Sequence, residues 1–115
     1  MFRVAGRAYA CDVSAVREVV PLDRVTRIPG APAAILGLIN VRGSIITVVN
    51  AAALLHPGDA SRSQSMVLIV DAGSRGVGLA AERVADVRAL REDEGYTELD
   101  VREVVTRAVA ISEDQ

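Results

Sequence analysis

The sequence has very few aromatic side chains: its 115 residues include one phenylalanine, two tyrosines and no tryptophan. Lysine is absent too, because all 13 basic residues are arginines, and 15 acidic residues bring the formal net charge to -2. Proteins that bind nucleic acids present a cationic surface, and those that bind single strands also stack bases on aromatic rings. The composition therefore argues against a nucleic-acid partner, and a nucleic-acid-binding small β-barrel is kept only as an alternative.

Cysteine and histidine are equally scarce. Cys11 and His56 are the single representatives of their types, which excludes an internal disulfide framework and a Cys/His zinc cage. No serine lies within motif distance of the histidine, so nucleophilic catalysis has no support. The sequence predicts a protein that is not an enzyme and that has no catalytic residues, metal or cofactor.

Long hydrophobic runs are missing as well. The longest run, Ala33 to Ile39, contains a glycine and is far shorter than the roughly 20 residues of a membrane-spanning helix. The N-terminus has no cationic region followed by an apolar core, so it does not resemble a secretory signal. We therefore expect a cytoplasmic chain with no direct membrane insertion.

Small and branched apolar residues are abundant, and half of the chain is hydrophobic. One chain of this length can bury a single core, so residues 1–115 are expected to form one domain. Valine and isoleucine favour strands because branching at Cβ suits a pleated surface. The runs that predict strands are Phe2 to Ala5, Ala8 to Val13, Val19 to Val25, Ile45 to Val49, Met66 to Val70, Val77 to Ala81, Val84 to Leu90 and Ala108 to Ile111.

Turn signals separate these runs. Ala5 to Arg7 and Ala72 to Gly76 supply glycines between two extended segments, as hairpins require. Helix is the minority, with short helices expected at Ala51 to Leu55 and at Glu98 to Val105. Short strands at this spacing indicate a small barrel or a sandwich.

The chain contains a weak internal repeat with an offset of 68 residues. Laying Tyr9 to Leu22 over Val77 to Leu90 without a gap aligns Val16 with Val84, Glu18 with Asp86, Val19 with Val87 and Leu22 with Leu90. We interpret this as a duplication that produces two related half-structures packed on each other. A chance alignment in a valine-rich chain is the alternative.

The two copies differ in their C-terminal continuations. The first continues into the segment Ile45 to Val49 and the helix at Ala51, whereas the second reaches Ala108 to Ile111 and then stops. By this comparison the chain ends one strand and one short helix early. The expected consequence is an open sheet edge, which invites self-association by strand addition from another chain.

Three segments resemble the CheW chemotaxis coupling protein family. The longest is Ile28 to Asn50, in which a proline-rich loop leads to the run Gly37-Leu38-Ile39-Asn40-Val41-Arg42-Gly43 and then to a strand. Upstream, Tyr9 to Val19 is similar to the family's first element, and downstream Val77 to Val87 is similar to a later one. Departures include Thr47 in place of proline, Asn50 in place of aspartate and Glu82 in place of aspartate.

This resemblance implies an all-β fold of two SH3-like five-stranded β-barrel subdomains on a shared hydrophobic centre, the second without its last strand and helix. It also implies a non-enzymatic chemotaxis adaptor, a scaffold in two-component signal transduction. Such a protein couples the cytoplasmic tip of a methyl-accepting chemoreceptor to the regulatory domain of the histidine kinase CheA. It would be cytoplasmic and recruited to membrane-associated receptor arrays. A CheW-like scaffold for another kinase pathway, such as surface motility, is the alternative.

The resemblance also implies a set of partner-binding residues, each carried over through the motif it occupies: Val16, Glu18, Gly37, Arg42, Gly78, Val84 and Val87. We expect the side chains of Glu18 and Arg42 to interact on the surface that meets partners. For the valines two interpretations stay open, namely core positions or an apolar groove between the barrels. The glycines serve either a turn or the floor of that groove.

Overall fold

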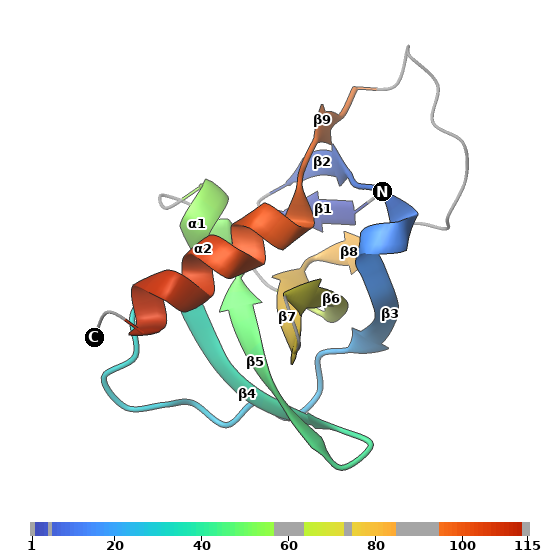
Figure 1. Ribbon diagram of the computed structural model, residues 1–115. Helices are drawn as coiled ribbons and strands as arrows, with labels where there is room; N and C mark the ends of the chain where they lie inside the picture. The colour runs from blue at the N-terminus through green and yellow to red at the C-terminus, as the bar shows by residue number, and fades with distance from the viewer. Residues whose placement is uncertain (1, 5, 57–63, 73–74, 85–94, 114–115) are drawn as a thin grey trace.

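The structure is a computed structural model that describes residues 2–4, 6–56, 64–72, 75–84 and 95–113. Within these residues the chain forms two sheets, two α-helices and one short 3-10 helix, η1 (Figure 1). The first half comprises β1 (Phe2–Val4), β2 (Arg7–Ala10), η1 (Val13–Ala15), β3 (Val16–Pro21), β4 (Ile35–Val41), β5 (Ser44–Asn50) and α1 (Ala51–Leu55). The second half comprises β6 (Met66–Ala72), β7 (Arg75–Ala81), β8 (Arg83–Val84), β9 (Thr97–Glu98) and α2 (Val101–Glu113).

The strands form one four-stranded and one five-stranded sheet. The smaller sheet has the order β8-β1-β2-β9 and the larger has the order β3-β6-β7-β5-β4. Most neighbours are antiparallel, but β2 with β9 and β5 with β7 are parallel, so both sheets are mixed. The expectation of a mostly β fold is confirmed. In Figure 1, β1, β2 and β9 lie at one end of the molecule and the β4–β5 turn projects at the other.

The antiparallel pairing of β3 with β6 is repeated in that of β8 with β1, with the same offset of 68 residues that the sequence shows. Val16 on β3 pairs with Val70 on β6, and Val84 on β8 pairs with Phe2 on β1. Because Val84 is Val16 plus 68 and Val70 is Phe2 plus 68, the two pairs are equivalent. The duplication predicted from sequence is thus visible in the registers.

The parallel pairs also correspond, with an offset of 68 residues between Tyr9 and Val77 and of 50 residues between Thr47 and Thr97. Thr47 on β5 pairs with Val77 on β7, and Thr97 on β9 pairs with Tyr9 on β2. In each sheet the central hairpin therefore comes from one half of the chain and its flanking strands come from the other half. The halves interlock, with β4 as the one described strand that has no counterpart in the second half.

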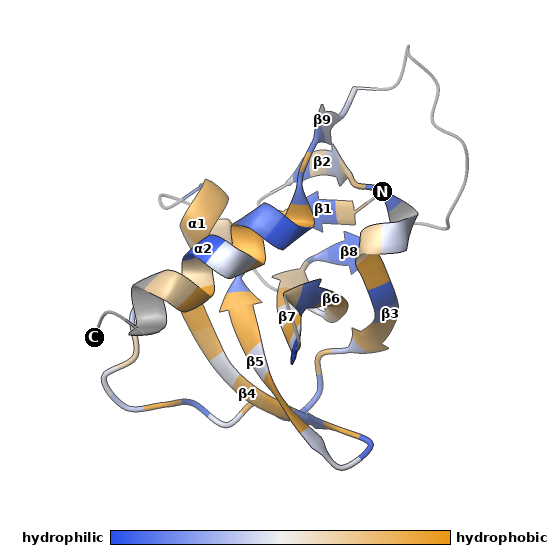
Figure 2. Cartoon of the chain, viewed as in Figure 1, coloured by the Kyte–Doolittle hydropathy of each residue, from blue (hydrophilic) through white to orange (hydrophobic). Residues whose placement is uncertain are grey.

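Two hydrophobic clusters hold the described residues together. The main cluster combines Phe2, Val4 and Tyr9 of the smaller sheet with β6, β7 and α2, whose Val101 and Val105 are buried. The second cluster lies on the opposite face of the larger sheet, around Ile39, Ile46, Val48, Val67, Ile69 and Ala80. Figure 2 shows hydrophobic residues along β4 and β5 and hydrophilic ones at the turn that joins them.

The C-terminal segment differs from the expectation. Ala108 to Ile111 lies within α2 and not in a strand, because Val101, Val105 and Ala108 follow helical spacing and are buried together against β5, β6 and β7. Asp100 begins this helix by accepting a hydrogen bond from the backbone N–H of Glu103.

The expectation that the second half lacks its final strand and helix is also wrong. The described chain ends with β9 followed by α2, which correspond to β5 followed by α1 in the first half. The cap residues correspond too, since Asn50 accepts from the N–H of Ala53 as Asp100 accepts from that of Glu103.

Some strand boundaries also differ from those predicted, because the local sequence pattern did not define them. The strand expected over Val19 to Val25 is β3, which begins at Val16 and ends at Pro21. β4 was not predicted, because Gly37 interrupts its apolar pattern. Of the run Val84 to Leu90, only Val84 lies within the described residues. None of the described helices is long and apolar enough to cross a membrane.

Candidate functional site

The tip of the β4–β5 hairpin has a backbone conformation that normally favours glycine. Val41 pairs with Ser44, so Arg42 and Gly43 form a two-residue loop, and both have positive φ, at 49° and 88°. A loop with two positive φ values is the type I′ turn, which matches the twist of the flanking strands. The side chain of Asn40 accepts a 2.8 Å hydrogen bond from the N–H of Gly43 and supports the turn. Arg42 is the one non-glycine residue with positive φ among the described residues. Residues held in such uncommon conformations cluster at functional sites.

Arg42 pairs with Glu18 across the larger sheet. The guanidinium donates to a carboxylate oxygen of Glu18 on β3, the opposite edge strand, and this interaction raises the pKa of Arg42 above its ordinary value. The Arg42 side chain is 72% exposed, whereas that of Glu18 is 25% exposed. The expected contact between these two side chains is therefore present, with Arg42 as its accessible member.

A groove of about 940 Å³ lies beside Arg42, which is one of its lining residues. Its apolar lining comes from β3, β4 and the start of β5, and Ile45 stands at its rim with 64% of its surface exposed. Its polar lining includes Asp23, Arg24 and Arg42. Protein interfaces have apolar centres, and arginine is the charged residue that is enriched in them, so an exposed isoleucine beside an exposed arginine fits an interface. We call this surface the hairpin groove.

Gly37 shapes one wall of the hairpin groove. Thr26 runs alongside β4 and exchanges two 2.8 Å backbone hydrogen bonds with Leu38. A Cβ on Gly37 would lie 2.5 Å from the carbonyl oxygen of Thr26 and 2.6 Å from Val25, so any side chain there would displace this segment. Gly37 therefore acts by permitting close packing.

Gly78 is a buried residue of the same sheet, on its central strand β7. A Cβ at this position would lie 2.6 Å from Val67 and 3.3 Å from Val48, both members of the second hydrophobic cluster. Ile46 of that cluster would be the next neighbour, at 3.6 Å. Both predicted glycines are thus buried positions that set the shape of the larger sheet.

The predicted valines lie elsewhere. Val16 and Val84 are half-buried and both pack against the main cluster, although they belong to different sheets. Neither valine lines the hairpin groove. The structure thus brings Glu18, Arg42, Gly37 and Gly78 to the larger sheet and places the two valines on the main core. Val87 lies outside the described residues.

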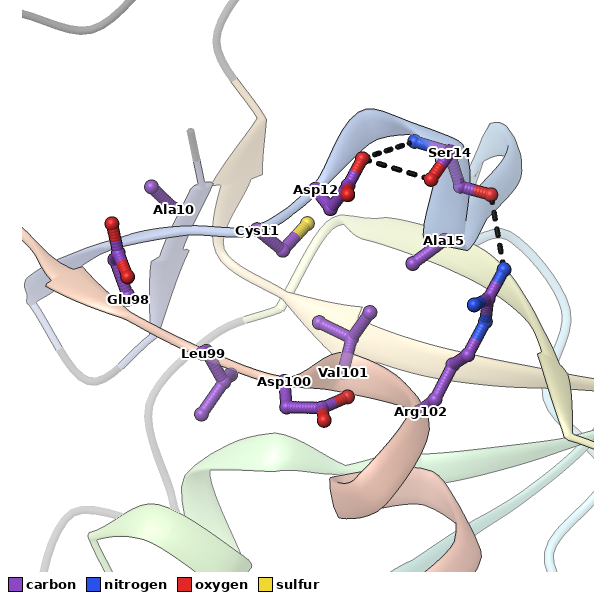
Figure 3. A pocket seen from close by; sticks show the side chains of 10 residues that line it. All are labelled: Ala10, Cys11, Asp12, Ser14, Ala15, Glu98, Leu99, Asp100, Val101 and Arg102. Atoms are coloured by element: carbon purple, nitrogen blue, oxygen red, sulfur yellow. Dashed lines mark hydrogen bonds between the residues drawn. The ribbon is translucent and has the colours of Figure 1, made fainter.

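A second hollow, of about 720 Å³, opens where β2 and β9 diverge (Figure 3). Leu99 donates its N–H to the carbonyl of Ala10, and beyond this bond the two segments separate. Asp12 turns back to accept 2.8 Å and 2.9 Å hydrogen bonds from Ser14, which lower the pKa of its carboxyl. Arg102 on α2 crosses the opening and donates to the carbonyl of Ser14.

Cys11 and His56 occupy structural positions. Cys11 is half-buried at the second hollow, and burial raises the pKa of its thiol. His56 ends α1 and donates its backbone N–H to the carbonyl of Ala52. Its ring also contacts the hydroxyl of the buried Tyr9, which links α1 to the smaller sheet.

Comparison with known proteins identifies the family. The model of the CheW-like domain matches residues 1–115. The chemotaxis protein CheW of Rhizobium meliloti (strain 1021) is 37% identical over 87 residues, which cover 75% of this chain and 56% of that protein. That of Klebsiella aerogenes is 28% identical over 95 residues, which cover 82% and 57%.

A solved structure agrees with these matches. The crystal structure of the scaffolding protein TtCheW from Thermoanaerobacter tengcongensis has a TM-score of 0.69 and 32% identity, and the match covers 80% of this chain and 60% of that one. The chain therefore belongs to the family of CheW-like domains. It spans about three fifths of the length of the curated relatives it matches.

Sequence reasoning missed one part of the site, the exposed Ile45. An isoleucine inside a strand ordinarily indicates a core position. The signal that could have predicted its exposure is its position three residues after Arg42, just beyond a two-residue turn. There the hairpin extends beyond the rest of the sheet. The lining of the hairpin groove by the segment after β3 was also not predicted.

Proposed function

We propose that this chain is a non-enzymatic scaffold of chemotaxis signalling that couples chemoreceptors to the histidine kinase CheA. Membership of the CheW-like family over residues 1–115 supports this proposal, as do the names of its relatives. In this role the chain binds the cytoplasmic tip of a receptor and the regulatory domain of the kinase. It works in the cytoplasm, at membrane-associated receptor arrays.

The single observation that supports a location for partner binding is the hairpin groove. Its exposed Ile45 contributes nothing visible to the core, and the adjacent Arg42 is held in an uncommon backbone conformation with its guanidinium accessible. A partner that covers this surface would bury the isoleucine and replace water around the arginine. The larger sheet supplies a rigid base for both.

The other proposed site residues act in two different ways. Gly37 and Gly78 maintain the groove from within, because each occupies a point that no side chain can enter without moving its neighbours. Val16 and Val84 are half-buried at equivalent places of the two halves, where their exposed atoms offer apolar contact to a receptor helix. Val87 is proposed for the same role from its motif alone.

The architecture proposed for this function is a pair of small SH3-like barrels within one domain. The second hydrophobic cluster supports the first barrel, because its members come from the larger sheet and from the segment around Leu22 and Val25 that follows β3. The contact of Arg42, in the β4–β5 turn, with Glu18 on the opposite edge strand β3 supports a sheet that curls around this cluster. The smaller sheet would form the second barrel against the main cluster.

Charge reversal at the hairpin tests the proposed function. Arg42→Glu should abolish co-precipitation of the receptor cytoplasmic fragment and the kinase regulatory domain, because a carboxylate replaces the accessible cation and repels Glu18. The melting temperature should remain within a few degrees of the wild type, since exposed ion pairs contribute little to stability.

Arg107→Glu is the matched control. Arg107 also pairs with a carboxylate, that of Glu103, and its side chain is 70% exposed, close to the value for Arg42, but it lies on α2 away from the groove. This variant should assemble as the wild type does. Wild-type assembly by Arg42→Glu, or equal loss in both variants, would contradict the proposed place of binding.

A further inference from the structure

Each half of the chain is completed by a hairpin that belongs to the other half. The β1–β2 hairpin fills the space between β8 and β9, and the β6–β7 hairpin fills the space between β3 and β5. The two insertions use equivalent registers, since Phe2 pairs with Val84 as Val70 pairs with Val16. The strands that flank each hairpin therefore form a binding surface for a hairpin of the opposite half, and the structure defines every pairing between them.

Neither half has a complete core of its own. The main cluster contains Phe2, Val4 and Tyr9 from the first half and Leu68, Val70, Leu79, Val101 and Val105 from the second half. All of these side chains are at least nine-tenths buried. A half without its partner would expose this apolar surface together with unpaired strand edges, both of which favour association.

We propose that a second copy of this chain can supply the missing half, so that two copies form a half-exchanged dimer. In this dimer, the first half of one copy folds with the second half of the other, and the reverse. Every contact between halves is preserved, because the same residues meet in the same registers. The halves are joined only once, between Leu55 at the end of α1 and Met66 at the start of β6, so one connection has to be rearranged.

The exchange would alter how the candidate site is assembled. Glu18 on β3 pairs with Ile69 on β6, and the hairpin groove rests on a cluster that includes Val67. In the exchanged dimer each of the two grooves would be lined by the first half of one copy and would rest on the β6–β7 hairpin of the other copy. The dimer would therefore carry two complete sites, while the monomer carries one.

Concentration decides between the two forms. A short connection within one chain acts as an effective concentration on the order of millimolar, and the second copy has to compete with it. At about 10 μM the monomer should account for nearly all of the protein. At about 1 mM roughly half should be dimeric.

The first test uses the wild-type full-length chain. The protein is unfolded in denaturant, refolded at about 1 mM or at about 10 μM, and measured by sedimentation before and after dilution. We expect a species with twice the mass of one chain, abundant only after refolding at the higher concentration. A strictly monomeric mass after refolding at about 1 mM would overturn the proposal.

The second test asks whether two defective full-length chains repair each other. Gly37→Val disrupts the first half, where the added side chain meets Val25 and Thr26, and Gly78→Val disrupts the second half at Val67. Refolded together, the two variants should yield a two-chain species with one protected β core in hydrogen exchange. Each variant refolded alone is the control and should lack that protection.

Failure of the mixture to produce a folded two-chain species, while the wild type refolds normally, would also overturn the proposal. Both readouts are mass and backbone protection, so they do not depend on receptor or kinase binding. A chain that forms the exchanged dimer but binds neither partner would uphold this inference and reject the proposed function.

Discussion

The two halves of the molecule share their strand registers but differ in the length of chain between equivalent strands. Thirty residues separate Val16 from Thr47 in the first half, and twelve separate Val84 from Thr97 in the second. The longer connection contains β4 and the groove-forming segment after β3. The comparison shows that the interlocked hairpins are the invariant part of the fold, while the surface proposed for binding is an addition carried by one half.

Local chemistry explains another difference between the halves. Asn50 pairs with Ala80, and the equivalent positions of the second parallel pair are Asp100 and Asp12. Two carboxylates facing each other on adjacent strands repel. Each aspartate instead caps a helical turn, so these segments diverge and the second hollow opens between them.

The largest expected effect concerns Gly78, whose counterpart in the first half is Ala10. Gly78→Ala should lower the free energy of unfolding by about 1–3 kcal/mol, because its Cβ would overlap Val67 in a packed sheet. Gly76→Ala, on the same strand and face, should be nearly neutral, because its Cβ would meet only the flexible end of Arg17 at 3.1 Å. Urea unfolding measures both, and equal effects would mean that the buried glycine is not required.

A smaller effect is expected at the helix cap of the second half. Asp100→Ala should destabilise the protein by about 1 kcal/mol, because the N–H of Glu103 loses its acceptor at the start of α2. Asp100→Asn keeps a side-chain oxygen and should lose much less. Thermal unfolding of the two variants distinguishes capping from charge, and an Asn variant as unstable as the Ala variant would reject the cap.

The smallest effect is a pH dependence that belongs to Asp12. Its pKa is lowered below the ordinary value of 3.8 by hydrogen bonds from Ser14, so its contribution to stability is present above that value and lost as pH falls through the folded pKa. Asp12→Asn should therefore flatten the stability profile below about pH 4 and leave it unchanged near pH 7. Urea unfolding at pH 3 and pH 6 compares the slopes. A profile as steep as that of the wild type would show that other carboxylates dominate.

The sequence predicted the β1–β2 and β6–β7 hairpins, because Gly6 and the Ala72 to Gly76 segment mark turns between short apolar runs. It predicted α2 poorly. Ala108 to Ile111 has no visible period by itself, and only its continuation of the spacing from Val101 and Val105 reveals a helix. A local window therefore divided one element into a short helix and a strand.

The pairing of distant strands was beyond local patterns. No local sequence signal near Thr47 or Thr97 predicts that these strands run parallel to a strand of the opposite half. The register is decided by packing across the whole sheet. The contact between Glu18 and Arg42 was predictable from the family motifs. The exposure of Ile45 was not, since a strand isoleucine resembles a core residue until its sheet is known.

The measurement that tests the account most directly is the binding of Ile45→Ala to the two proposed partners, titrated one at a time. Ile45 is exposed, so its truncation should leave the melting temperature unchanged. If the hairpin groove is the partner surface, the dissociation constant for the receptor tip or for the kinase regulatory domain should rise about tenfold or more. Wild-type affinity for both partners would contradict the claim that this groove is where the scaffold binds.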